Sequence, residues 1–406
     1  MKYLTLYLFT LSLSSLSIAQ DCGSDEIMRK EYNDNPALLE IVHQGLLTAA
    51  HSENNFQSRA LITIPTVVHI IHDNGIGNIS DEQILDGLRI MNEDYSRMNP
   101  DTVDTRSTSY APFKQYAGAM DIEFKLAKID PNGECTNGIL RVNAPTLTYE
   151  AGEDCKYTSN GGSGGWPKDS YFNIWVVNSI GGNVNGLTIA GYAYYPFGAA
   201  NNDGYGILII NSTMGTIEMA ENSDGRTLTH EMGHSLGLPH IFNADGAATG
   251  CHTNDCFSNG DYSCDTPPQT ESAQNCNDSW NLCTSIPVND PYGIDVVDQI
   301  ENYMSYNSCQ NMFSKDQVNM MGDNLNTISF LASLSSASNA TATGVNQTEV
   351  LCLTDFTVPN TSICSGTVVD FEDLSYHAIT GWAWSVSPGV EGVDYLYVNG
   401  TDATTQ

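Results

Sequence analysis

Basic residues are scarce in this sequence. The 406 residues include 15 Lys and Arg against 48 Asp and Glu, which gives a formal net charge of -33 at pH 7. Binding to nucleic acid or to an anionic membrane surface needs a cationic protein face, so this composition argues against both partners. Hydrophobic residues make up 41% and aromatic residues 9% of the chain, which suffices for a core and excludes wholesale disorder. The acidity is typical of a well-solvated surface whose carboxylates can bind cations.

Long apolar runs are also lacking, because no segment after the N-terminus reaches the ~18 apolar residues that a transmembrane helix needs. The N-terminal run Tyr3–Leu13 follows Lys2 and precedes small residues at Ser17 and Ala19, as in a secretory signal peptide. We therefore predict a signal peptide over residues 1–19 and a secreted, extracellular protein with no membrane anchor. The eleven cysteines agree with export, because disulfides persist outside the cytosol, and their odd number leaves one thiol unpaired.

The rest of the chain divides by its sequence patterns. Residues 20–59 are polar and weakly patterned, whereas residues 60–332 combine β-rich runs with helical patterns. The β-rich runs lie at 64–71, 122–126, 172–177 and 207–210. This order predicts a mixed α/β, or α+β, domain. Residues 333–350 are rich in Ser, Ala, Thr and Asn and are predicted to be an interdomain linker, followed by a partial β-sandwich at 351–406.

The segment from His230 to His240 carries the chemistry. Residues four apart share one face of a helix, so His230 and His234 can direct two imidazoles at one ion, with Glu231 projecting beside it. Gly237 permits a sharp turn out of the helix, after which His240 can return as a third ligand. Three nitrogen ligands with an open fourth position predict a catalytic zinc rather than a structural one.

Histidines with this spacing also occur by accident in cores and on surfaces, but five specified positions arise by chance in only about one chain of this length in ten thousand. Zinc lowers the pKa of a bound water toward ~7 and polarises the scissile carbonyl. We therefore expect Glu231 to take the proton of this zinc-bound water as general base and to donate it to the leaving amine. The sequence predicts hydrolysis of peptide bonds in proteins, with hydrolysis of non-peptide amides as a less favoured alternative.

The zinc motif, HExxHxxGxxH, together with a downstream methionine turn at residues 301–306, resembles the metzincin zinc peptidases. Two further segments, Cys-Asp-Thr-Pro-Pro-Gln at 264–269 and Cys-Gln-Asn-Met-Phe-Ser at 309–314, resemble the pappalysin family of secreted metzincins. The sequences at 172–176 and 191–193 look like the active-site sheet of that family. The resemblance covers roughly residues 64–334.

The resemblance implies a cleft enzyme with two subdomains divided by the zinc. Met304 would form the hydrophobic floor beneath the three histidines. Tyr306 would turn toward the metal and hydrogen-bond the oxyanion that forms during hydrolysis, and the alternative is a buried tyrosine with a structural hydrogen bond. Some relatives prefer a basic residue after the cut, but this chain has no Asp or Glu between Met304 and Lys315, with Gln310 and Asn311 instead. That departure argues against a Lys/Arg preference.

Cys22 stands apart from the other ten cysteines, all of which lie beyond residue 60. A thiolate could occupy the fourth zinc position and displace the catalytic water. Pappalysin precursors look similar, with a Cys-Gly pair near the start of a pro-segment. Residues 20–59 are therefore predicted to be a pro-segment that keeps the enzyme latent until cleavage near Arg59. An intermolecular disulfide remains an alternative, and lipid modification is disfavoured because no cysteine occupies the predicted cleavage site.

The family pattern also implies disulfides and a calcium site. The implied pairs are Cys251–Cys283 and Cys276–Cys309, which leaves Cys256–Cys264, Cys135–Cys155 and Cys352–Cys364. The loop after the zinc motif is dense in oxygen ligands, among them Asp245, Asp255, Asp261 and Asp265. Related enzymes carry calcium in this loop, and a solvated acidic loop is the alternative.

The segment from Phe356 resembles a PKD-type, immunoglobulin-like module through Val-Asp-Phe-Glu-Asp at 369–373 and Trp-Ala-Trp at 382–384. Such a module favours a second hypothesis, in which the chain is an extracellular binding or adhesive protein that recognises a surface, polysaccharide or protein ligand. Hydrolysis of casein with and without a chelator distinguishes this hypothesis from a zinc peptidase.

Overall fold

The computed structural model describes residues 20–51, 61–184, 187–199, 202–242, 251–272 and 275–347, together with isolated positions between 356 and 396. Several predicted features lie outside the described residues, namely the signal peptide at 1–19, Arg59, Asp245, Cys352, Cys364, Trp382 and Trp384.

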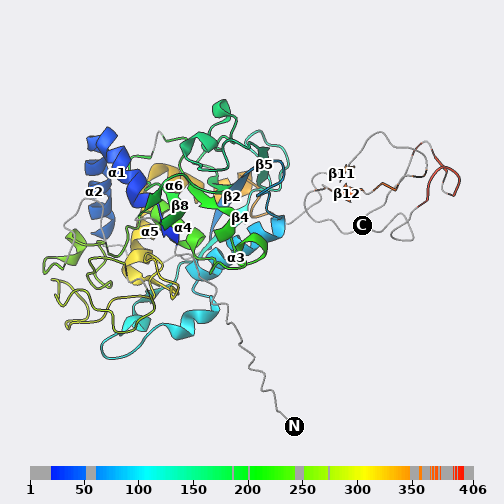
Figure 1. The fold of residues 1–406 in the computed structure, drawn as a ribbon. Helices are drawn as coiled ribbons and strands as arrows, with labels where there is room; N and C mark the ends of the chain where they lie inside the picture. Colours follow the sequence, from blue (N-terminus) through cyan, green and yellow to red (C-terminus); the bar gives the residue numbers. More distant parts are fainter. Residues whose placement is uncertain are drawn as a thin grey trace, which may run out of the picture.

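An eight-stranded sheet lies at the centre of the protein (Figure 1), with strand order β1-β8-β9-β6-β2-β4, while β5 also pairs with β2 and β7 with β8. Its strands are β1 (Gln20–Cys22), β2 (Ile62–His72), β4 (Ile122–Leu126), β5 (Ile139–Asn143), β6 (Phe172–Val177), β7 (Asn183–Val184), β8 (Leu187–Ala193) and β9 (Ile207–Ile210). Strand β2 runs parallel to β4, β5 and β6, and β6 parallel to β9, whereas β8 runs antiparallel to β9. Parallel strands are covered on both faces, which explains why every residue of β6 is buried. The predicted mixed α/β fold is confirmed.

Three helices fix the frame of the domain. Helix α3 (Asp81–Tyr95) contacts β4 and α4, and it is capped by the Ser80 side chain, which accepts a hydrogen bond from the Gln83 amide. Helix α4 (Thr227–Ser235) carries the zinc motif and contacts β8 and β9. Helix α5 (Lys315–Thr327) begins with a capping box and contacts α6. The zinc motif therefore lies against the half of the sheet that ends at β8 and β1.

The segment that follows the catalytic region is not an extended linker up to residue 347. It forms helices α6 (Ser329–Leu334) and α7 (Ala337–Ala342), and α7 contacts β2. The Asn339 side chain donates to the carbonyl of Ser170, and the Thr343 carbonyl accepts from Lys128. Within the predicted linker at 333–350, residues 337–342 therefore form a helix that buries Ala340 and packs on β2.

The predicted pro-segment adds one strand and two helices. Strand β1 pairs in parallel with β8 and so extends the edge of the sheet. Helices α1 (Ser24–Asp34) and α2 (Pro36–Ala50) follow, and Figure 1 shows them side by side next to the body of the domain. Helix α2 contacts α5 and buries Val42 and Leu46 completely. The sequence of this region is polar and weakly patterned, so its composition does not indicate this packing.

Short pairings complete the described structure. Strand β10 (Phe313–Ser314) pairs with β3 (Ala117–Gly118), and β11 (Phe356–Thr357) pairs with β12 (Glu372–Asp373). The last pairing is too small to confirm the predicted C-terminal β-sandwich. None of the helices among the described residues combines the length and the apolar character that a membrane crossing requires.

Candidate active site

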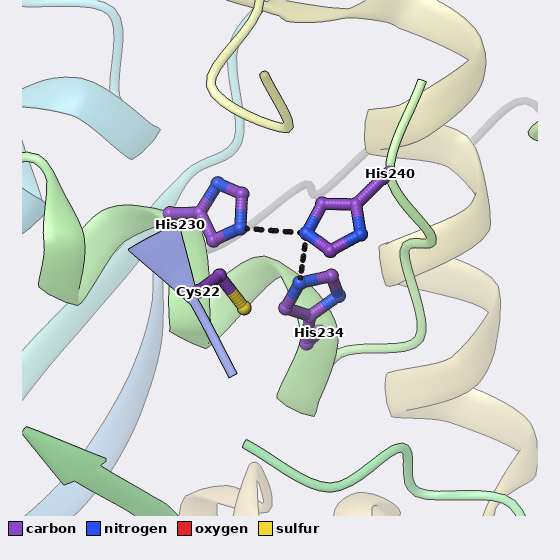
Figure 2. A group of neighbouring side chains, drawn as sticks. All are labelled: Cys22, His230, His234 and His240. Carbon is purple, nitrogen blue, oxygen red and sulfur yellow. Dashed lines mark hydrogen bonds between the residues drawn. The ribbon is translucent and has the colours of Figure 1, made fainter. Parts of the chain in front are cut away.

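Helix α4 positions two of the three predicted ligands (Figure 2). His230 and His234 project from one face of this helix, which ends at Ser235. The chain then turns at Gly237, whose φ of 97° is a left-handed conformation that favours glycine. The Leu238 amide donates back to the Gly233 carbonyl, and the turn returns His240 to the other two rings. All three imidazoles are buried.

The outer nitrogen of each ring has an acceptor. Nδ1 of His230 lies 2.6 Å from the Tyr303 carbonyl, Nδ1 of His234 lies 2.7 Å from the Leu238 carbonyl, and Nδ1 of His240 lies 3.0 Å from the Asp25 carboxylate. A carbonyl can only accept a hydrogen bond, so Nδ1 carries the proton in His230 and His234. Burial lowers the pKa of His230 to about 3, which keeps that ring neutral.

The three Nε2 atoms consequently present lone pairs to one another. Nε2 of His240 lies 3.1 Å from Nε2 of His230 and 3.1 Å from Nε2 of His234 (Figure 2). Bare lone pairs repel at this distance, and a cation between them removes the repulsion. Zinc with bonds of ~2.0–2.1 Å to imidazole nitrogen fits such a group. The donor set therefore matches the predicted catalytic zinc.

Glu231 lies in the same buried space. Its Oε2 accepts hydrogen bonds from the Ser24 hydroxyl at 3.2 Å and from the Cys22 thiol at 3.5 Å, and its Oε1 has no hydrogen-bond partner among the described residues. Burial raises the pKa of Glu231 to about 7, against the opposing effect of the Cys22 hydrogen bond. A Cβ added to Gly191 on β8 would lie 3.1 Å from Glu231 Cγ. Glycine at this position therefore leaves room for the carboxylate.

The methionine turn lies next to helix α4 and its histidines. Met304 is completely buried, and its sulfur would lie 2.5 Å from a Cβ added to Gly233 on α4. The hydroxyl of Tyr306 lies 2.9 Å from Nε2 of His240. Gln310 donates to the carbonyls of Tyr303 and Ser305, so this amide holds the turn in place.

Three residues of the N-terminal segment, Cys22, Ser24 and Asp25, reach this centre. The Cys22 sulfur and the ring nitrogens of the three histidines all lie within 4.8 Å of one another. Burial and the Glu231 carboxylate raise the pKa of the Cys22 thiol, so a thiolate here needs a cation beside it. Ser24 accepts from the Ala193 amide at 3.0 Å while it donates to Glu231. Asp25 accepts from His240, so the segment contacts both a ligand and the predicted base.

The protein resembles known peptidases over most of its described length. The M43 peptidase family, described as pregnancy-associated plasma protein-A, matches residues 160–326. An extracellular metalloprotease of Arthroderma benhamiae is 30% identical over 297 residues, which cover 69% of this chain and 81% of the relative. Mature mirolysin of Tannerella forsythia in complex with a cleaved peptide is 32% identical, with a TM-score of 0.58 over 70% of this chain and 98% of that chain. A promirolysin mutant of the same organism is 30% identical, with a TM-score of 0.61 over 78% of this chain and 96% of that chain.

The chain belongs to the pappalysin family of metallopeptidases. It is therefore a metalloendopeptidase, and the family implies a catalytic zinc with which the three histidines are compatible. The mixed α/β fold also agrees with the solved mirolysin structures.

The disulfides of this pappalysin agree with the predicted framework in part. The structure contains Cys251–Cys283, Cys256–Cys264 and Cys276–Cys309. The predicted Cys135–Cys155 pair is wrong, because Cys155 is a free thiol while Cys135 is disulfide-bonded. Cys155 is completely buried in the main hydrophobic core, where it acts as a small apolar side chain. The unpaired cysteines therefore include Cys155 as well as Cys22, which the argument from an odd count missed.

The three predicted calcium ligands lie around the Cys256–Cys264 disulfide. Asp255 accepts from the Phe257 amide and from the Asn289 side chain, next to the Cys256–Cys264 disulfide. Asp261 and Asp265 are buried near Asp316, whose carboxylate accepts from the Asp265 amide. Burial raises the pKa of Asp261 to about 8, and burial together with the Asp316 charge raises the pKa of Asp265. Asp261 and Asp265 are therefore buried carboxylates close to each other, while Asp255 has hydrogen-bond partners of its own.

Several residues of the site were not identified from the sequence. Ser24 and Asp25 follow the Cys-Gly pair directly, but short polar residues at a helix start carry no signal beyond helix capping. Asp94 and Arg226 form an ion pair at 3.1 Å next to the start of α4. Of these residues, only Arg226 carries a sequence signal for a role in the site, because it lies four residues before His230.

Proposed function

We propose that this pappalysin is a secreted zinc endopeptidase made as a latent precursor, with Glu231 as its general base. The observation that carries the proposal is the convergence of Cys22 and Ser24 on the three histidines and Glu231. A substrate that is to be hydrolysed needs the space that these two side chains fill. Extracellular localisation is supported by the names of the homologous extracellular metalloproteases.

When bound, zinc supplies a Lewis acid that polarises the scissile carbonyl and acidifies a water ligand. Glu231 accepts the proton of the attacking water and then donates it to the leaving amine. The position of Glu231 on α4, directly after the ligand His230, suits both transfers because it places the carboxylate beside the three histidines. Tyr306, beside His240, donates its hydroxyl to the oxygen that becomes negative as the carbonyl is attacked.

The activity is tested with the purified precursor after activation, using casein and a quenched peptide library with and without a zinc chelator. Glu231→Ala should retain stoichiometric zinc and lose peptide hydrolysis. Glu218→Ala is a matched control, because Glu218 is a solvent-facing carboxylate that accepts from Ser80. Retained turnover in Glu231→Ala with bound zinc contradicts the role of the base.

Latency is tested by the rate at which the precursor becomes active. Cys22→Ala should activate faster than the parent chain, because the thiol no longer competes for the histidine centre. The mature N-terminus should lie close to Ala60, as determined by Edman degradation or mass spectrometry. A Cys22→Ala precursor that stays fully latent, or a mature N-terminus elsewhere, contradicts the proposed pro-segment.

We also propose that calcium binds beside the buried carboxylates Asp261 and Asp265. Burying neighbouring carboxylates is costly, and Oδ1 of Asp265 has no hydrogen-bond partner among the described residues. A divalent cation with oxygen ligands offsets that cost. Calcium should raise the unfolding temperature of the parent chain, and Asp265→Asn should reduce the increase. An unfolding temperature that does not respond to calcium contradicts the proposal.

A further inference from the structure

Asp94 lies where helix α3, helix α4 and the methionine turn meet. Its side chain is completely buried, with an exposed fraction of 0%. Oδ2 accepts from the Thr229 hydroxyl at 2.7 Å, and Oδ1 accepts from the Tyr303 hydroxyl at 2.8 Å. Arg226, which precedes α4, lies 3.1 Å from the same carboxylate and also pairs with Asp101.

The Thr229 and Tyr303 hydroxyls belong to residues that both hold His230 in place. Thr229 is the residue directly before His230 on α4. Tyr303 accepts the Nδ1 proton of His230 on its backbone carbonyl, at 2.6 Å. One carboxylate therefore holds the backbone from which His230 projects and also the residue that orients its ring.

The charge of Asp94 has compensating partners. Arg226 offsets the negative charge, and two hydroxyl donors occupy the two oxygens. Without the carboxylate, the Thr229 and Tyr303 hydroxyls would lose their acceptor in a buried place, which costs free energy. Glu93, the neighbouring residue on α3, instead pairs with Arg89 at the surface.

We propose that Asp94 is a positioning residue that sets the orientation of His230 toward the zinc ion. The inference rests on the proposed zinc function and deepens it. Direct hydrogen-bond partners of metal-ligating histidines typically change metal affinity by about 10- to 100-fold when they are mutated. Asp94 acts one contact further out, through Thr229 and Tyr303, so the lower end of about tenfold applies. Asp94→Asn removes the charge and one acceptor, so we expect a zinc dissociation constant higher by about this factor.

The test uses the full chain with the Glu231→Ala substitution, which prevents self-cleavage. Zinc affinity is measured by competition with a chromophoric chelator, and ligand geometry by the visible spectrum of the cobalt-substituted protein. Asp94→Asn should weaken zinc binding and shift the cobalt bands, whereas Glu93→Gln should change neither. Unchanged affinity and spectrum, with only a lower unfolding temperature of the metal-free chain, would show a purely structural role and overturn the inference.

A second set of variants covers the case in which Asp94→Asn does not fold. Thr229→Ser keeps the hydroxyl and should bind zinc like the parent, while Thr229→Val and Tyr303→Phe should each bind it more weakly. If all three variants bind zinc as tightly as the parent chain, the inference is overturned while the proposed function stands. A parent chain that binds no zinc overturns the proposed function and this inference with it.

Discussion

Replacement of Asp25 should release the precursor from latency faster without changing the mature enzyme. Both carboxylate oxygens of Asp25 lie within hydrogen-bond distance of Nδ1 of His240, at 3.0 and 3.1 Å. When zinc binds His240, Nδ1 keeps its proton and donates it to this carboxylate. Asp25→Ala removes the acceptor from the pro-segment side, so it weakens the attachment of that segment to the centre.

The size of the effect follows from the exposure of the contact. A hydrogen bond to a charged group contributes about 1.5–3 kcal/mol when it is buried. The Asp25 side chain is 31% exposed, and solvent screening lowers the contribution of such contacts toward about 1 kcal/mol. This free energy corresponds to about a fivefold change in an equilibrium constant. We therefore expect activation about five times faster in Asp25→Ala, and an intermediate rate in Asp25→Asn, which keeps a neutral acceptor.

The assay follows the loss of the pro-segment on gels and the appearance of peptidase activity with a quenched peptide. Glu26→Ala is the matched control, because Glu26 is also an acidic residue in the first turn of α1 but pairs with Arg29 at the surface. This control accounts for any loss of helix stability from removing a charge near the helix N-terminus. Equal activation rates in Asp25→Ala and Glu26→Ala would refute a specific contribution of the contact with His240.

Three further changes have expected outcomes. Tyr306→Phe should lower kcat by about 10²-fold with little change in KM, because it removes one hydrogen-bond donor to the developing oxyanion. A kcat equal to that of the parent enzyme would show that the hydroxyl has only a structural role. Gly191→Ala should lower kcat by about tenfold with unchanged zinc content, because its Cβ would press on Glu231 Cγ from 3.1 Å. Burial lowers the pKa of His69 to about 4, so this side chain is neutral in the folded chain at neutral pH. Its contribution to the free energy of unfolding is fully present above pH ~6.5 and is lost as the pH falls toward 4. The total loss is about 3 kcal/mol. Chemical denaturation at several pH values should show a smaller loss in His69→Gln, and parallel curves would contradict this account.

The zinc centre was predictable because its information is local. The positions of His230, Glu231 and His234 follow from helical spacing, and Gly237 marks the turn that returns His240. The buried strands were predictable for a similar reason, since apolar runs of a few residues indicate strands that are covered on both faces. In both cases the residues that define the feature lie within a few positions of one another.

The remaining features depend on contacts between distant residues. The partner of Asp25 is separated from it by 215 positions, and no composition or spacing connects the two. The free state of Cys155 depends on its burial in the core, which counting cysteines does not reveal. Residues 337–342 look like a linker in composition, yet they form α7 because β2 offers them a packing surface. A local sequence pattern predicts the conformation of a segment but not its tertiary contacts with distant residues.

The pairing of β1 with β8 explains why the Cys-Gly pair needs both of its residues. Cys22 lies opposite Gly191, and the Gly23 amide donates to the Gly191 carbonyl at 2.8 Å. Side chains alternate between the faces of a strand, so a shift of one residue would turn Cys22 away from the histidines. A Cβ at Gly23 would lie 2.8 Å from Ile189 Cγ2, so a larger residue there would push β1 away from β8. The cysteine thus supplies the sulfur, while the glycine allows the close strand pairing that brings this sulfur to the zinc centre.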